Sequence, residues 1–91
     1  MLKFAWDEAK AAANLAKHGV SFEEAATVFG DPMALTFDDP DHSIGGRRFL
    51  TFGSSERSRV LLLVNAGRGR TVRTIGARKA TKHQGSIYEQ G

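Results

Sequence analysis

The sequence predicts an α+β fold in which two N-terminal helices pack on a small antiparallel β-sheet and a short helix ends the chain. Three observations lead to this prediction. Apolar residues recur at helical spacing up to about residue 30, turn residues and alternation replace that spacing after Pro32, and a helix-capping pattern returns at Thr81. With 91 residues, the chain is expected to form a single domain, residues 1–91.

The first predicted helix begins at a cap on Asp7 and runs to about Lys17, with Gly19 just past its end. Four alanines on one side of this helix could sit close to whatever the helix covers. We expect that face to be the packed one: Ala9, Ala12, Ala13 and Ala16.

The second predicted helix begins in a capping box, in which Ser21 and Glu24 satisfy each other's backbone donors. Its apolar stripe follows the i, i+3, i+4, i+7 pattern: Phe22, Ala25, Ala26 and Phe29. The sequence Gly30-Asp31-Pro32 then ends the helix.

The rest of the chain is expected to form four strands and a last helix. The strands are predicted at residues 33–37, 48–52, 59–64 and 71–77, and residues 4–6 are a candidate for a further short strand. Short turns between them favour an antiparallel meander. The run 60–64 is apolar on both faces and therefore belongs in mid-sheet. The last helix is predicted from Thr81 to about Glu89, and one face of the sheet is expected to stay open.

Composition excludes several classes of protein. The chain has no cysteine, which excludes a disulfide framework, a thiolate nucleophile and cysteine-ligated metal. Its longest aliphatic run has five residues, whereas a membrane-spanning helix needs about 20. Residues 1–8 lack the apolar stretch of a signal peptide, so we expect a cytoplasmic protein with no membrane partner.

No metal or cofactor site is expected. The histidines at positions 18, 42 and 83 have no partners at zinc-ligand spacing. Gly67-Arg68-Gly69 is too short to cradle a pyrophosphate and is better explained as a turn.

Charge is divided unevenly along the chain. Residues 1–45 carry a net charge of −5, residues 46–91 carry +8, and all eight arginines lie in the second half. Arginine suits phosphate because its planar fork bonds two oxygens at once. Two interpretations stay open: a nucleic-acid or other polyanion partner, or arginines that are solvated or paired with the acidic half.

Two arginines of the last predicted strand are the leading site candidates. Strict alternation places Arg73 on the face of Ile75 and Ala77, and Arg78 at the strand end beside the last helix. Gly76 between them suggests a bulge that could re-aim Arg78. Such an arginine either anchors a helix through its carbonyls or holds a scissile phosphate. Arg48, in a neighbouring strand, is a weaker candidate.

Three further residues each have two interpretations. His18 either complements the negative end of its helix or acts as a general acid or base in RNA cleavage. Lys10 is either solvated or a phosphate contact. Tyr88 either packs the last helix or stacks on a base.

Several stretches of the sequence form a specific set when taken together. They are Phe4-x-Trp6-Asp7, Lys17-His18-Gly19-Val20-Ser21-Phe22-Glu23-Glu24-Ala25, Asp31-Pro32, Arg68-Gly69, Arg73-x-Ile75-x-Ala77-Arg78-Lys79-Ala80 and Ile87-Tyr88-Glu89. Over nearly the whole chain this set resembles the BrnT toxins of type II toxin–antitoxin systems. The resemblance implies a RelE-like fold and an endoribonuclease that needs no metal or organic cofactor and inhibits translation. It also implies a BrnA-like, DNA-binding antitoxin as partner in a hetero-oligomer, besides the RNA substrate.

The resemblance and the charge pattern together give the expected site. The catalytic candidates are Arg73, Arg78, His18 and Lys10, and the expected RNA contacts are Arg48, Arg68, Lys79 and Tyr88. The sequence departs from the family pattern at four positions: Asn65, Arg70, Gly76 and Gln84. Because a glutamine cannot take up a proton, a catalytically weak or inactive RNA- or antitoxin-binding module of the same fold is the alternative.

Overall fold

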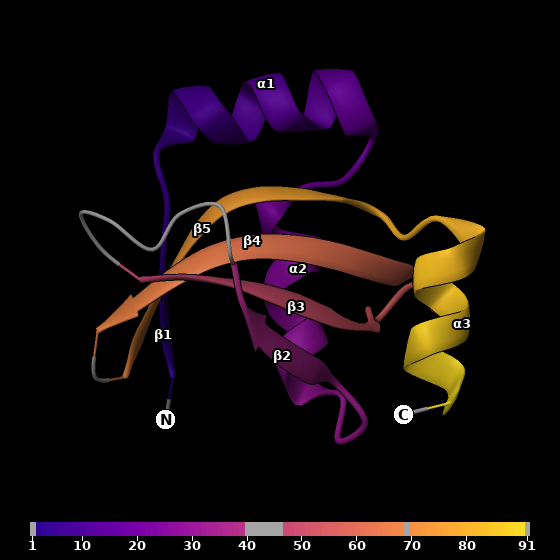
Figure 1. Cartoon of the computed structure of the whole chain (residues 1–91). Coiled ribbons are helices and arrows are strands. Elements are labelled where there is room, and N and C mark those ends of the chain that lie inside the picture. Colours follow the sequence, from indigo (N-terminus) through magenta and orange to yellow (C-terminus); the bar gives the residue numbers. More distant parts are fainter. Residues whose placement is uncertain (1, 40–46, 69, 91) are drawn as a thin grey trace.

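The computed structural model describes residues 2–39, 47–68 and 70–90, and Figure 1 shows their arrangement. The elements in chain order are β1 (Lys3–Ala5), α1 (Glu8–His18), α2 (Phe22–Thr27), a 3-10 turn (Val28–Gly30), β2 (Leu35–Asp38), β3 (Arg48–Ser54), β4 (Val60–Arg68), β5 (Thr71–Lys79) and α3 (Lys82–Gln90). The predicted α+β class is confirmed. His42 and most of the predicted polar connection at 38–46 lie outside the described residues, as does Gly69 of the predicted 67–69 turn.

The five strands form one sheet in the order β1-β5-β4-β3-β2. Strands β2 to β5 make the predicted antiparallel meander. The candidate strand near residue 4 is confirmed, but β1 pairs with β5 in parallel. The sheet is therefore mixed rather than wholly antiparallel, because the chain passes through every other strand before β5 returns beside β1.

Helix α1 lies along the β5 side of the sheet, and α2 lies behind one face (Figure 1). Asp7 caps α1 by accepting from the Lys10 N–H, and Gly19 ends it with φ of 69°. The expected packing face was wrong. The alanines at 9, 12, 13 and 16 are exposed, while the partly buried residues of the helix are Ala11, Asn14 and His18. The packed side is set by hydrogen bonds from Asn14 to β5. A prediction based on the spacing of apolar residues does not detect such a polar contact.

The hydrophobic core lies between α2 and one face of the sheet. Its members are Val20, Phe22, Ala25, Val28, Leu61, Leu63 and Ala77. The 3-10 turn brings Val28 fully into this core, whereas the predicted stripe residues Ala26 and Phe29 are only partly buried. Gly53 of β3 lies directly under this turn, and a Cβ there would be 2.6 Å from Val28 Cγ1.

The opposite face of the sheet carries a second set of apolar residues. The register places them on the face away from α2: Leu35, Phe37, Leu50, Phe52, Leu62 and Val64. Helix α3 lies against β3 at one end of the sheet, where Phe52 and Leu62 are buried. The ring of Phe37 packs edge-on against Phe52, with centroids 5.9 Å apart, and is 47% exposed. We call the part of this face that the helices leave uncovered the open face.

Candidate functional site

The register of β5 brings Arg73 and Arg78 to the same face. Leu62 pairs with Arg78 and Ala66 pairs with Arg73, but a register shift after Val64 leaves Ile75 as an extra residue in β5. This bulge reverses the alternation, so Arg73 lies on the open face and not on the face of Ala77. The expected grouping of Arg73 with Ala77 was therefore wrong, because alternation holds only along an unbroken ladder.

Arg48 completes a cross-strand row on the open face. It pairs with Ala66 of β4, and Ala66 pairs in turn with Arg73 of β5. With neighbouring strands about 4.8 Å apart, the two arginine Cα atoms lie about 10 Å apart on either side of one alanine. Two arginines thus flank a small residue on one face of the sheet, an arrangement that suits an anionic chain laid across the strands.

Arg78 is held in place by α3. Its Nη1 donates to Gln84 Oε1 at 3.0 Å and to the carbonyl of Lys79 at 3.1 Å. Gln84 and Thr81 complete the predicted capping box, with bonds of 3.0 and 3.1 Å between each backbone N–H and the other's side chain. Gln84 is neutral, so its contact with Arg78 does not neutralise the positive charge of the arginine.

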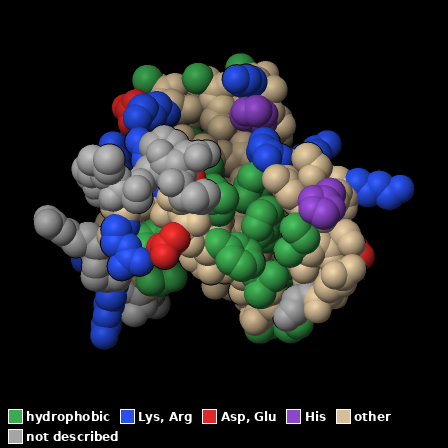
Figure 2. Space-filling model, viewed as in Figure 1, with side chains coloured by type: hydrophobic (Ala, Val, Ile, Leu, Met, Phe, Trp, Pro, Cys, Tyr) green, Lys and Arg blue, Asp and Glu red, His purple; other side chains and the backbone are tan. Residues whose placement is uncertain are grey.

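Helix α1 contributes cations on the same side of the molecule. A groove on the α2 side of this helix is lined by Ala11, Ala12 and Leu15, and Lys10 lies on the opposite flank of the helix together with Lys17. His18 follows Asn14 by one turn of the helix and is half-buried. Figure 2 shows basic and histidine side chains along the α1 rim above a hydrophobic patch in the middle of the open face.

Two expected RNA contacts, Lys79 and Tyr88, are placed differently, and the side chain of a third cannot be assigned. Lys79 pairs with Leu61, so it lies on the helix-covered side of the sheet. Arg68 ends β4, and its side chain lies outside the described part. Tyr88 belongs to α3, and its hydroxyl donates to Asp31 Oδ2 at 2.5 Å. The structure thus brings Arg48, Arg73 and Arg78 to one face of the sheet, and it places Lys79 and the Tyr88 hydroxyl away from them.

The contact between Tyr88 and Asp31 ties α3 to the start of the β2 segment. The Ser54 N–H, the Tyr88 hydroxyl and the Met33 N–H, in that order of effect, hold the pKa of Asp31 below its usual value. The hydrogen bond to Asp31 in turn raises the pKa of Tyr88. A phenol engaged in this way favours the packing interpretation of Tyr88 over base stacking.

An ion pair behind the sheet joins the acidic and basic halves of the chain, as one of the two open interpretations allows, but the residues that form it were not predicted. Glu24 is 3% exposed and accepts hydrogen bonds from Arg59 and from Ser55 Oγ at 2.6 Å. Arg59 Nη2 also donates to the carbonyl of Gly19 at 3.1 Å, which fixes the end of α1 beside His18. The bond with Arg59 is the main cause that lowers the pKa of Glu24. The predicted capping box is therefore formed only in part. Ser21 Oγ accepts from the Glu24 N–H, but the Glu24 carboxylate accepts from Arg59 and Ser55.

Asn65, one of the four departures, also lies away from the open face. Its side chain is buried on the α2 side and donates to Thr51 Oγ1 at 3.1 Å. Thr51 Oγ1 lies 3.1 Å from Thr36 Oγ1, so the asparagine completes a polar row inside the protein. This departure therefore affects packing and not the arginine surface.

Within residues 2–39, 47–68 and 70–90, no group of three or more His, Asp or Glu side chains could hold a metal ion. In the same residues, no helix is both long and apolar enough to cross a bilayer. The charge of the candidate site comes instead from arginines and lysines.

Comparison with solved structures defines the class of fold. The crystal structure of the Brucella abortus ribonuclease toxin BrnT matches with a TM-score of 0.69 and 22% sequence identity, covering 90% of this chain and 100% of that chain. The α+β sheet with its open face is thus a fold that this chain shares with that protein. A search of curated proteins found no match.

The family follows from the sequence itself. A family profile described as "Ribonuclease toxin, BrnT, of type II toxin-antitoxin system" matches residues 6–84. The chain belongs to the BrnT family of ribonuclease toxins. Membership of a type II toxin–antitoxin family implies an antitoxin partner.

Proposed function

We propose that residues 1–91 act as one toxin domain, a metal-independent endoribonuclease (a hydrolase) that cleaves RNA in the cytoplasm and thereby inhibits translation. The observation that carries this proposal is the β5 register, by which Arg73, Arg78 and Arg48 share the face of the sheet away from α2. The family match supports the choice of RNA as substrate.

In this reaction the ribose 2′-hydroxyl attacks the neighbouring phosphorus. The bond to the 5′-oxygen breaks, giving a 2′,3′-cyclic phosphate and a 5′-hydroxyl. Negative charge builds on the phosphoryl oxygens during attack, and preorganised donors aimed at that charge are often the largest catalytic contribution. Arg73 and Arg78 supply these donors, and Arg48 holds the adjoining backbone.

Proton transfer falls to the α1 residues. One proton must leave the attacking 2′-hydroxyl and one must reach the departing 5′-oxygen. His18 is suited to this exchange because an imidazole ring can both accept and donate a proton, and Lys10 on the neighbouring flank assists it or neutralises a phosphate. The bond from Arg59 to Gly19 supports a fixed position for His18.

The partner we propose is a BrnA-like, DNA-binding antitoxin that forms a hetero-oligomer with the chain and covers the open face. An amphipathic acidic segment would suit it, because the exposed ring of Phe37 lies on the same face as the three arginines. Apolar contacts would supply affinity and the charges orientation.

The alternative is an RNA- or antitoxin-binding module with weak or no activity. Gln84 favours it, since a residue that cannot exchange a proton contacts Arg78. Incubating the purified chain with bulk RNA in EDTA separates the two. Metal-independent cleavage supports the ribonuclease, whereas salt-dependent RNA binding without cleavage supports the module.

A further inference from the structure

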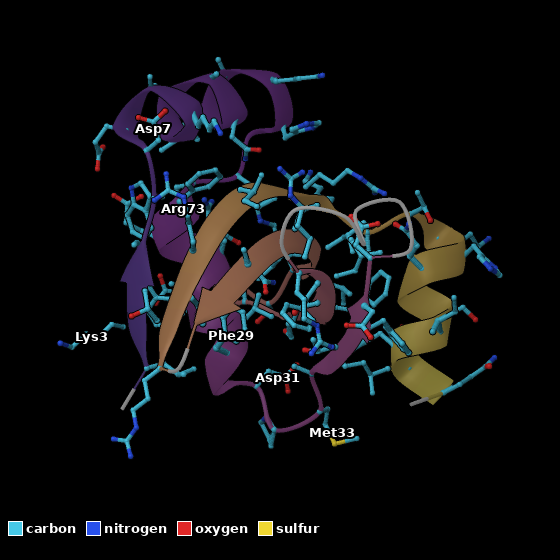
Figure 3. The ribbon with its side chains drawn as sticks, turned by 60° about the vertical axis from the view of Figure 1, so that its left-hand side comes forward. Lys3, Asp7, Phe29, Asp31, Met33 and Arg73 are labelled. Atoms are coloured by element: carbon cyan, nitrogen blue, oxygen red, sulfur yellow. The ribbon has the colours of Figure 1, made fainter. Side chains whose placement is uncertain are left out.

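A small pocket opens beside Arg73 on the open face. It has a volume of about 250 Å³ and is lined by Ala5, Ala66, Gly67, Thr71 and Arg73. These residues come from the three adjacent strands β1, β5 and β4. Figure 3 labels Arg73 where β5 runs beside β1, below the start of α1 at Asp7.

The floor of the pocket is flat because its residues are small. Ala5 and Ala66 are the direct neighbours of Arg73 on either side, and Gly67 adds backbone only. Larger side chains at these positions would fill the space above the strands. The result is an apolar floor with a guanidinium on one side and the Thr71 hydroxyl available as both donor and acceptor.

The size and chemistry of this pocket match one aromatic ring system. Pockets for drug-sized ligands measure about 300–1,000 Å³, so this one suits a single base rather than a whole nucleotide. Proteins commonly stack unpaired RNA bases on apolar or guanidinium planes and bond their edges with polar side chains. An apolar floor, a guanidinium and a hydroxyl provide these contacts here.

We propose that this pocket is a base subsite, which receives the base of the nucleotide whose phosphate Arg73 holds. The inference rests on the proposed function and deepens it, because the subsite would select which nucleotide adjoins the cleaved bond. Arg48, across Ala66, then holds the phosphate on the other side.

The test fills the pocket without touching an arginine. Ala66→Leu places a larger side chain on its floor, and Ala16→Leu makes the same change on the exposed side of α1 as a matched control. Nucleoside 5′-monophosphates and ribose 5-phosphate, which lacks a base, are titrated into each full-length chain and followed by backbone amide NMR shifts.

We expect at least one nucleoside monophosphate to shift the Ala5, Ala66 and Gly67 amides and to bind at least about fivefold more tightly than ribose 5-phosphate. Ala66→Leu should abolish that preference while ribose 5-phosphate still binds, and Ala16→Leu should preserve it. Equal binding with and without a base, or a preference that survives Ala66→Leu, would overturn the subsite. If the wild-type chain shows the preference but leaves RNA uncut in EDTA, the subsite stands and the proposed cleavage fails.

Discussion

The side-chain amide of Asn14 pairs with both backbone groups of Ala77 as a neighbouring strand would. Asn14 Nδ2 donates to the Ala77 carbonyl at 2.8 Å, and the Ala77 N–H donates to Asn14 Oδ1 at 3.1 Å. Strand β1 pairs with β5 only from Thr71 to Arg73, so this amide takes over where β1 has ended. Asn14 thus joins α1 to the strand that carries both catalytic candidates.

Replacing this amide should destabilise the protein. Asn14→Ala removes two bonds to Ala77 and a third, of 2.9 Å, to the Val20 carbonyl, so we expect a loss of about 2–3 kcal/mol. Asn14→Asp should cost at least as much, because a carboxylate cannot donate to two carbonyls. Urea unfolding measures both, with exposed Lys17→Ala as the control that changes stability by less than about 0.5 kcal/mol. A similarly small effect of Asn14→Ala would contradict the edge-pairing role.

The two arginines of β5 should differ in what their loss affects. If they hold the scissile phosphate, Arg73→Ala and Arg78→Ala should each slow RNA cleavage by about 10²–10³-fold, and lysine should rescue poorly. Only Arg78→Ala should also lower stability, by about 1–2 kcal/mol, since Arg78 bonds to Gln84 and the Lys79 carbonyl.

Arg57→Ala serves as the control for these variants because its side chain is 68% exposed in a turn behind the sheet. Cleavage rates are read beside thermal melting curves. Unchanged cleavage by both β5 variants with an intact fold would remove Arg73 and Arg78 from the site. A loss of activity in Arg78→Ala that is no larger than its loss of folded protein would leave Arg78 as an anchor of α3 only.

Gln84→Glu should strengthen α3 and weaken RNA binding. A carboxylate keeps the capping bond to the Thr81 N–H, suits the positive end of the helix, and turns the contact with Arg78 into an ion pair. We expect the free energy of unfolding to rise by about 0.5–1 kcal/mol. The slope of log binding constant against log salt concentration for RNA should become smaller in magnitude by about one. Titration at several salt concentrations, with Glu89→Gln as a control elsewhere on α3, measures it. Tighter RNA binding by Gln84→Glu would show that Arg78 does not face the phosphates.

Acid should destabilise the protein through Glu24. The hydrogen bond from Arg59 lowers the pKa of this carboxylate in the folded state, so its contribution is fully present above the unfolded value of about 4.3. That contribution is lost as the pH falls through the lowered folded pKa. Glu24→Gln should cost about 2–3 kcal/mol at neutral pH, and its stability should fall less steeply in acid. Unfolding curves at pH 7 and pH 3 compare the two chains, and equal slopes with pH would exclude Glu24 as the sensitive group.

Local features of the fold were predictable from neighbouring residues. A helix start depends on a capping side chain and a backbone N–H three residues later. The structure has this hydrogen bond at each of the three predicted caps, Asp7, Ser21 and Thr81. The strands of the meander follow from short turns between apolar runs. The family resemblance, carried by motifs spread along the chain, is confirmed by the match over residues 6–84.

The sequence alone determined which residues carry positive charge and that they belong to strands of a small sheet. Only the tertiary structure decided which of them share a face. Gly76 indicated a bulge in β5, but only the pairing with β4 fixes the extra residue at Ile75 and so reverses the side of Arg73. The tertiary structure also decided which side of α1 packs against the sheet. Its alanines carry the helical signal, but two hydrogen bonds between Asn14 and Ala77, 63 residues apart, set which side meets the sheet. Such long-range polar contacts are formed only when the chain has folded, so they leave no periodicity to read beforehand.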